Sequence, residues 1–258
     1  MEVIDAYLHC GLSKFEPIET VRDVMARAGA ARGVLVQHLG EYDNSYISGI
    51  AAAEPARYAA VGLLDHARPD AIEALSEMKE AGVLKGIRLT AQWLEDAPDL
   101  WRRAVDLGFI LVLFAPEGII QNLQTLANFL ADRPRARIVL THLGNPATAA
   151  SPSFENHQSL FALAKREGLI YQLSGMDMCC PYPHEPLYPL IAEAVQSFGP
   201  ARLMWGSNYP VVGDTENYAR DLDLVKDGRL PIPQDAIAQV IGGTARELWF
   251  PESVIRKT

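Results

Sequence analysis

The sequence predicts a single TIM-type (β/α)₈ barrel spanning residues 1–258, and two observations support it. Eight short, near-continuously apolar runs recur along the chain, which is typical of strands covered on both faces of a parallel sheet. They alternate with amphipathic stretches of helical length, a pattern that predicts parallel strands joined by right-handed crossovers. Eight such units in about 250 residues favour a closed barrel, with an open doubly wound sheet as the alternative.

The expected strands and helices follow one another in regular order. Strands are predicted at residues 3–9, 33–38, 58–65, 84–90, 109–115, 137–142, 169–174 and 202–206. Helices are predicted at residues 20–28, 45–53, 70–81, 97–106, 119–131, 157–165, 186–197 and 216–225, with a last one at 234–248. Several of these helices are followed by a glycine, such as Gly29 and Gly82, which suits the left-handed position just past a helix end.

The composition indicates a soluble enzyme-sized domain and argues against two classes of partner. Hydrophobic residues make up 49% of the chain and charged ones 21%, which is enough for a sizeable core. The net charge of −9 argues against a nucleic-acid or anionic-membrane surface. The three cysteines have no disulfide spacing, the N-terminus has no signal-peptide pattern, and the apolar run at 109–115 is too short for a bilayer. We therefore expect a cytoplasmic protein.

Polar side chains gather where the predicted strands end. In a barrel the C-terminal ends of all strands meet at one mouth, where catalytic groups are placed. Four of the six histidines fall at such ends, and alternation puts Tyr7 and His9 on the same face of the first strand. The residues concerned are Tyr7, His9, His38, His66, Arg88, His142, Ser174, Asn208 and Tyr209.

Each of these residues also has a structural interpretation. A single strand-end histidine is more often a hydrogen-bonded structural residue than a catalyst. Arg88 could pair with a carboxylate of the barrel, and Cys179 and Cys180 fit loop packing, since the sequence shows no neighbouring base. Trp93 suits packing as well, although its place after the fourth strand would also let it wall the pocket. No role is assigned to His157 or His184.

Six short motifs occur in the order found in one known family. They are Ile-Asp-Ala-Tyr-Leu-His at 4–9, Val-Gln at 36–37 with Asp-Asn-Ser-Tyr at 43–46, Lys-Gly-Ile-Arg-Leu at 85–89, Thr-His-Leu-Gly at 141–144, Met-Trp-Gly-Ser-Asn-Tyr-Pro at 204–210 and Ile-Gly-Gly-Thr-Ala at 241–245. Together they resemble the amidohydrolase-related (amidohydrolase 2) family of the amidohydrolase superfamily, in its lactonase-like branch of sugar and dicarboxylate hydrolases. The resemblance spans nearly the whole chain.

The chain departs from that family at the metal ligands. The resemblance implies two histidines on the first strand, a ligand on the fifth, a histidine on the sixth and an aspartate on the eighth. Here Tyr7, Phe114 and Asn208 occupy three of these positions, and only His9 and His142 remain. Two imidazoles and a neutral amide make a poor zinc site. We therefore expect no catalytic metal and no other cofactor.

The same resemblance implies lactone chemistry. In metal-free lactonases of this family the eighth-strand aspartate activates water, but Asn208 cannot accept that proton. His142 and His9 are then the available bases, and Tyr7 could donate to the oxyanion or orient His9. Arg88 suits a bidentate contact with a carboxylate, while His38, Asn44, Trp93 and Tyr209 are candidate substrate contacts.

The leading hypothesis is thus a metal-independent hydrolase opening a lactone or activated ester of a small carboxylate- or sugar-like substrate. A metal-free decarboxylase or lyase is one alternative, and a catalytically inactive ligand-binding homologue is another. The expected partner is a small, anionic substrate, with no nucleic acid or membrane, and a homo-oligomer is possible. The loops that choose the substrate, including residues 145–156, carry no pattern that names it.

Overall fold

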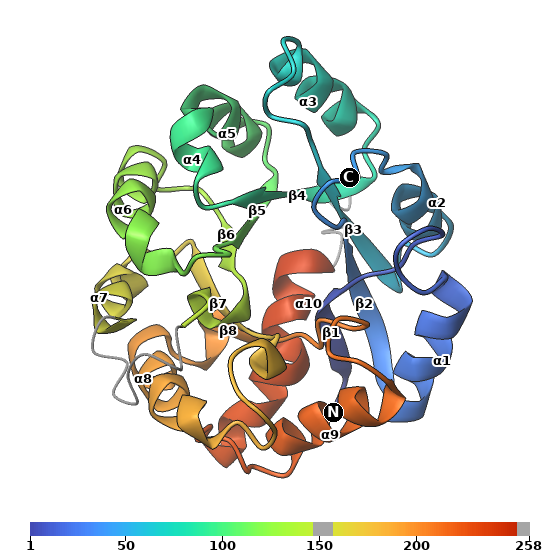
Figure 1. Cartoon of the computed structure of the whole chain (residues 1–258), viewed down its shortest axis with the longest axis vertical. Helices are drawn as coiled ribbons and strands as arrows, with labels where there is room; N and C mark the ends of the chain where they lie inside the picture. Colours follow the sequence, from blue (N-terminus) through green and yellow to red (C-terminus); the bar gives the residue numbers. More distant parts are fainter. Residues whose placement is uncertain (147–156, 252–258) are drawn as a thin grey trace, which may run out of the picture.

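Eight parallel strands form one sheet that curves into a nearly closed barrel, in a computed structural model that describes residues 1–146 and 157–251 (Figure 1). Each strand pairs with the next in chain order. The strands are β1 (Val3–Leu8), β2 (Ala30–Val36), β3 (Tyr58–Leu63), β4 (Leu84–Thr90), β5 (Ile110–Phe114), β6 (Ile138–Leu140), β7 (Leu169–Leu173) and β8 (Leu203–Trp205). The predicted barrel is therefore confirmed, and most of the 145–156 loop lies outside the described residues.

The helices surround the strands on the outside (Figure 1). They are α1 (Ile18–Ala28), α2 (Ser45–Ala53), α3 (Ala71–Glu80), α4 (Trp93–Asp96), α5 (Pro98–Asp106), α6 (Leu123–Asp132), α7 (Gln158–Phe161), α8 (Tyr188–Phe198), α9 (Thr215–Lys226) and α10 (Thr244–Trp249). Gly29 ends α1 with φ +76°, as its position in the sequence predicts, and its N–H donates to the Ala26 carbonyl. No helix among the described residues has the length and apolar composition needed to cross a bilayer.

Successive side chains of each strand point to opposite faces of the sheet, and this divides the core into two clusters. Val34 and Val36 of β2 belong to the inner cluster that fills the barrel, whereas Leu35 between them packs outward in the larger cluster beneath the helices. Burying both faces explains why the strands read as continuous apolar runs.

The seam between β1 and β8 is held by few backbone hydrogen bonds. The Asn208 N–H donates to the Tyr7 carbonyl and the His9 N–H to the Tyr209 carbonyl, each at 2.8 Å. A Cβ at Gly206 would lie only 2.7 Å from the Cβ of Tyr7, so only glycine allows this approach. The seam therefore fixes Tyr7, His9 and Asn208 relative to one another.

A buried carboxyl group reinforces this seam. Asp5 accepts hydrogen bonds from the Ser207 backbone N–H at 2.9 Å and the Ser207 hydroxyl at 2.6 Å. The Tyr7 N–H also donates to it at 3.1 Å. Burial raises the pKa of Asp5 to about 6, although these hydrogen bonds pull it the other way.

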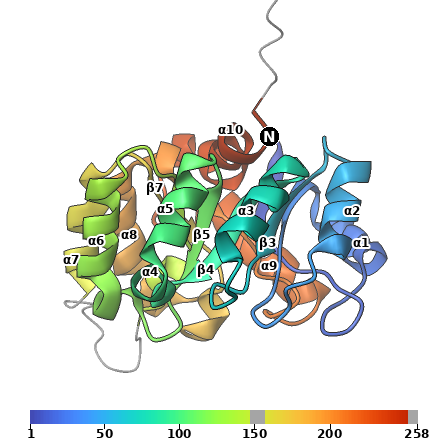
Figure 2. The same cartoon turned by 90° about the horizontal axis from the view of Figure 1, so that it is seen from above.

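The last predicted helix is broken into three pieces. Residues Gln234–Ala236 form a 3₁₀ turn, Gln239–Gly243 a π-helical turn, and only Thr244–Trp249 is α-helical. A Cβ at Gly242 would meet the Glu2 carbonyl oxygen at 2.2 Å, so this segment lies directly against β1. Trp249 of α10 joins the inner cluster of strand side chains and closes the barrel at the end where the N-terminus lies (Figure 2).

Candidate functional site

The ends of β1 and β6 bring three rings together at the open mouth of the barrel. Leu8 packs outward, so Tyr7 and His9 share the inner face, with ring centroids 5.2 Å apart. His142 lies edge-on to Tyr7, with centroids 4.8 Å apart. All three side chains are buried. The structure thus assembles three residues that the sequence predicted at the ends of two different strands.

The ring of His9 is fixed on two sides. Its Nδ1 lies 2.6 Å from the Val36 carbonyl oxygen, and Phe15 stacks on its face with centroids 4.8 Å apart. Burial and the positive charge of Arg88 lower the pKa of His9 well below its usual value, so the ring is neutral at pH 7. A carbonyl oxygen can only accept, so Nδ1 carries the hydrogen and Nε2 holds the lone pair.

His142 sits in a tight turn of left-handed residues. His142 has φ 52° and Leu143 has φ 55°, which is unusual for residues with a Cβ. The Leu143 carbonyl accepts from the Tyr171 hydroxyl at 2.7 Å and lies 2.8 Å from Nε2 of His157. Sequence reasoning missed both supporting residues because neither belongs to a motif.

The imidazole of His142 is oriented by the residues that directly follow β7. Its Nδ1 lies 2.9 Å from the Ser174 hydroxyl oxygen, which also accepts the His142 backbone N–H at 3.2 Å. A Cβ at Gly175 would come within 2.7 Å of that same nitrogen. Burial and then the charge of Arg88 lower the pKa of His142 to about 3, so this ring is also neutral at pH 7.

Arg88 brings a buried positive charge to the same mouth. Its Nη1 donates to the Gln37 carbonyl at 2.8 Å, and its guanidinium lies 5.8 Å from the Tyr7 ring centroid and 5.4 Å from that of Phe114. Arg88 Nε and the Tyr7 hydroxyl are both buried without a partner among the described residues. Burial raises the pKa of Tyr7, so its hydroxyl keeps its hydrogen at neutral pH. Buried donors of this kind need an acceptor.

Asn208 stands at the opposite side of the seam under a methionine. It has φ 59°, its side chain is buried, and its amide nitrogen lies 3.3 Å from Sδ of Met178. Met178 belongs to the loop between β7 and α8 and is 46% exposed. This loop therefore reaches back over the mouth to Asn208.

Two of the predicted substrate contacts are engaged elsewhere in the fold. The Asn44 side chain accepts from the Leu63 N–H at 2.8 Å and donates to the Leu63 carbonyl at 2.9 Å, which ties the loop after β2 to β3. Tyr209 is buried and packs edge-on against Tyr218, with centroids 5.9 Å apart. Substrate contact by either residue stays a prediction.

The other two predicted contacts lie among aromatic neighbours. Trp93 opens α4 and stacks on His66 and Trp101, with centroids 4.3 and 6.4 Å away. His38 lies edge-on to Phe15 at 5.2 Å, beside the ring stack of His9. His38 is thus the nearer of the two to the histidine pair, and its role also stays a prediction.

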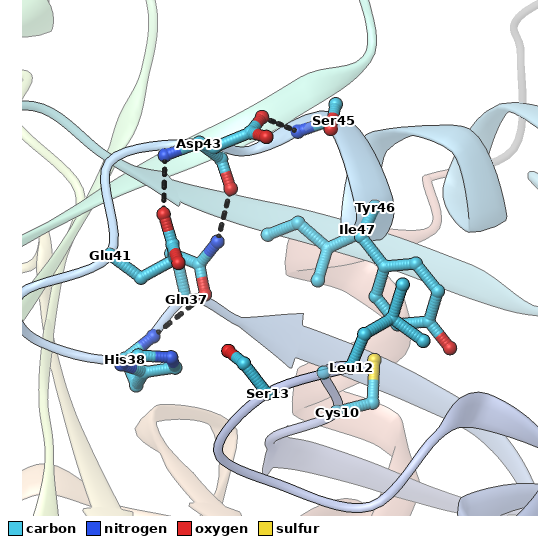
Figure 3. A pocket seen from close by; sticks show the side chains of 11 residues that line it. Cys10, Leu12, Ser13, Gln37, His38, Glu41, Asp43, Ser45, Tyr46 and Ile47 are labelled. Atoms are coloured by element: carbon cyan, nitrogen blue, oxygen red, sulfur yellow. Dashed lines mark hydrogen bonds between the residues drawn. The ribbon is translucent and has the colours of Figure 1, made fainter.

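A cavity of about 170 Å³ opens between the loops that follow β1 and β2 (Figure 3). His38 and Gln37 belong to its wall, but the polar groups there bond to one another. The Gln37 amide donates to the Asp43 carbonyl at 2.7 Å, and the Asp43 N–H donates to the Glu41 carboxylate at 2.9 Å. Tyr7 and Arg88, which carry the unpartnered donors described above, do not line this cavity.

The side chains at the mouth do not fit the divalent cation that the resemblance implies. His9 and His142 supply two imidazoles, while Tyr7 and Phe114 are aromatic and Asn208 turns its amide nitrogen to Met178. Within residues 1–146 and 157–251, only Asp177, His184 and Asp221 bring three potential ligand atoms together, and these lie on the loop after β7 and on α9. Zinc usually requires at least three good protein ligands.

Comparison with known proteins agrees with the motifs. The chain is 30% identical to an L-fucono-1,5-lactonase of Burkholderia ambifaria over 95% of its own length and 87% of that protein. It is 29% identical to a 4-sulfomuconolactone hydrolase of Rhizobium radiobacter over 81% and 72% of the two chains. Among solved structures, a probable 2-pyrone-4,6-dicarboxylic acid hydrolase from Acinetobacter baumannii with citric acid bound superposes with a TM-score of 0.78 at 16% identity. The match covers 96% of this chain and 99% of that one. Residues 11–250 match the amidohydrolase family, and the chain belongs to it.

Proposed function

We propose that this amidohydrolase opens the ring of a small anionic lactone, or cleaves a similarly activated ester, without a metal ion. The observation that supports it most is the meeting of two neutral imidazoles, a buried arginine and a protonated tyrosine at one mouth. The two curated relatives act on lactones by name, which supports a hydrolase of this class.

Hydrogen-bond partners suggest different roles for the two histidines. His9 holds its lone pair on Nε2, because Nδ1 donates to the Val36 carbonyl. The Ser174 hydroxyl can donate either to His142 Nδ1 at 2.9 Å or to the Gln172 side-chain oxygen at 3.4 Å, and the shorter contact is the better one. His142 then carries its hydrogen on Nε2. His9 is thus proposed as the base, and His142 as a hydrogen-bond donor to the substrate.

These roles give a balanced hydrolysis. Water attacks the lactone carbonyl carbon while its proton passes to Nε2 of His9. The carbonyl electron pair moves onto oxygen, which accepts hydrogen bonds from His142 Nε2 and the Tyr7 hydroxyl. The carbonyl then re-forms, the bond to the ring oxygen breaks, and that oxygen takes the proton back from His9. The product is the open hydroxy acid.

Arg88 is proposed to anchor the substrate and to adjust the pKa of both imidazoles. Its charge contributes to the low pKa of His9 and of His142. A carboxylate or sulfonate bound to the guanidinium would offset that charge, so a bound anion would make His9 a stronger base. This explains why an anionic lactone suits the site better than a neutral one.

A decarboxylase or lyase is the second candidate. The same Arg88 could hold a carboxylate while His142 supplies a proton to the carbon that loses carbon dioxide. The two reactions differ in their products, because lactone opening releases one acid equivalent and decarboxylation releases carbon dioxide.

The test is a pH-indicator assay on a panel of carboxylated, sulfonated and neutral lactones. The protein is first dialysed against a strong chelator and its metal content is measured. We expect acid release from anionic lactones by protein containing far less than one metal ion per chain. Activity that disappears with the metal and returns with zinc would refute metal independence, and carbon dioxide release in place of acid would favour the lyase.

A further inference from the structure

The loop between β7 and α8 connects the mouth with a group of buried charges. At its start, Gly175 lies against His142, and Met178 covers Asn208. At its end lies His184, whose side chain is fully buried and whose φ is 66°. Residues 175–184 therefore link the proposed reaction centre to the buried surroundings of His184.

His184 is held by α9. Its Nδ1 lies 2.9 Å from the Cys180 carbonyl oxygen, so that nitrogen carries a hydrogen. Its Nε2 lies 3.4 Å from Asp221 Oδ1 and 3.9 Å from Asp177 Oδ1. Both nitrogens thus face acceptors, an arrangement that suits the doubly protonated imidazolium.

Arg220 completes the group of charges. Its guanidinium lies 3.6 Å from Asp177 and 3.8 Å from Asp221, and it stacks over the Tyr182 ring at 4.6 Å. With His184 charged, two cations face two carboxylates and the group is neutral. With His184 neutral and both carboxyl groups ionised, the group carries one uncompensated negative charge beside the buried Asp221, which is costly. Burial and the charge of Asp221 raise the pKa of Asp177, which shows how closely the two carboxyl groups are placed.

We propose that charged His184 is a positioning residue that latches residues 175–184 onto α9 and so keeps Met178 on Asn208. Asp221 and Asp177 are its counter-charges, and Tyr182 adds a second attachment, to the segment that follows α9, by accepting a hydrogen bond from Arg229 at 2.8 Å.

The pKa of His184 moves in the direction that this latch requires. Burial alone would lower it, but the hydrogen bonds to Asp221 and the Cys180 carbonyl, with the charges of Asp221 and Asp177, raise it overall. The Cys180 thiol stays uncharged because burial and Asp177 raise its pKa. A raised histidine pKa means that the latch is complete below about pH 6.5 and is lost as the pH rises through the value in the folded protein.

Hydrogen exchange read by mass spectrometry tests the latch without relying on the proposed reaction. After correction for intrinsic rates, we expect the protection of residues 175–184 to fall about tenfold as the pH rises from 6 to 9, the effect expected when a hydrogen bond to a charged group is lost. His184→Gln should show the low protection at every pH. The double variant His184→Gln/Asp221→Asn removes one charge of each sign, and we expect it to regain protection that no longer depends on pH.

Asp223→Asn is the matched control for Asp221→Asn. It also changes an aspartate of α9 to asparagine, but on the exposed side of the helix, where Asp223 lies 3.9 Å from Lys226. It should leave the pH profile unchanged. Protection of 175–184 that is independent of pH in the wild type, or a double variant no better than His184→Gln, would overturn the latch. So would stoichiometric binding of zinc or manganese that is abolished by Asp221→Asn, because the three side chains would then be metal ligands.

Discussion

The Nδ1 atom of His142 lies 2.9 Å from the Ser174 hydroxyl oxygen, and the same hydroxyl accepts the His142 backbone N–H. One side chain directly after β7 thus holds this histidine in position, and a hydrogen bond donated by its hydroxyl to Nδ1 would leave the imidazole hydrogen on Nε2. The proposed division of labour between His142 and His9 depends on this contact.

Ser174→Ala should lower kcat about fivefold with little change in KM, because His142 would lose the donor that favours its Nε2–H form, and one hydrogen bond is worth about 1 kcal/mol. Steady-state kinetics on an active lactone measure this. Ser76→Ala is the control, since its hydroxyl only bonds the Ile72 carbonyl on the exposed face of α3. An unchanged kcat in Ser174→Ala would show that the tautomer does not matter.

Arg88→Gln should reduce kcat/KM for a carboxylated lactone by about 10²- to 10³-fold, the value of two hydrogen bonds between charged groups. The neutral lactone of the same ring should be much less affected, so the comparison of the two substrates is the measurement. Arg32→Gln removes an arginine that pairs with Glu2 at 3.0 Å and should change neither substrate. Equal losses on both substrates would contradict an anchoring role.

The pH profile of kcat/KM should stay flat on the acid side to below pH 5. The proposed base must be neutral, and its pKa lies well below 6.5 in the free protein, so acid protonates it only at low pH. Initial rates between pH 4 and 8, with folding checked by circular dichroism at each pH, measure this. An acid limb centred near pH 6.5 would point to an unperturbed histidine instead.

Asp5→Asn should flatten the pH dependence of stability. The native pKa of about 6 lies above the ordinary aspartate value of 3.8, so ionised Asp5 destabilises the fold at neutral pH, and this cost disappears as the pH falls through 6. The free energy of unfolding of wild type relative to Asp5→Asn should therefore rise by about 2.5 kcal/mol between pH 8 and pH 4, as measured with urea. Asp235→Asn, at an exposed position, is the control. A constant difference would mean that the hydrogen bonds to Asp5 fully offset the effect of burial on its pKa.

The sequence was most informative about features that lie within a single strand. Continuous apolar runs located all eight strands within a few residues, and the end of each run placed His9, Arg88 and His142 at a common mouth. The prediction of one continuous last helix was wrong. Gly242 lies directly against the start of β1, and the chain forms a π-helical turn there in place of α-helix.

What the sequence could not supply were partners far apart in the chain. His184 and Asp221 are separated by 37 positions in a loop and a helix without shared periodicity, so nothing marks them as a pair. The left-handed turn at His142 was hidden for another reason, since none of its first residues is the glycine that usually signals such a conformation. Its supports, Tyr171 and His157, become visible only in the fold.

The closure of the barrel by α10 has a consequence for folding. Trp249 fits against Gly86 of β4 and packs with side chains from β1 and β2, whose sequence positions precede it by up to about 240 residues. During synthesis the strands are made before the segment that covers their inner face at this end. A chain arrested before residue 244 would expose apolar side chains at an open end, so we expect it to be held by chaperones or to aggregate.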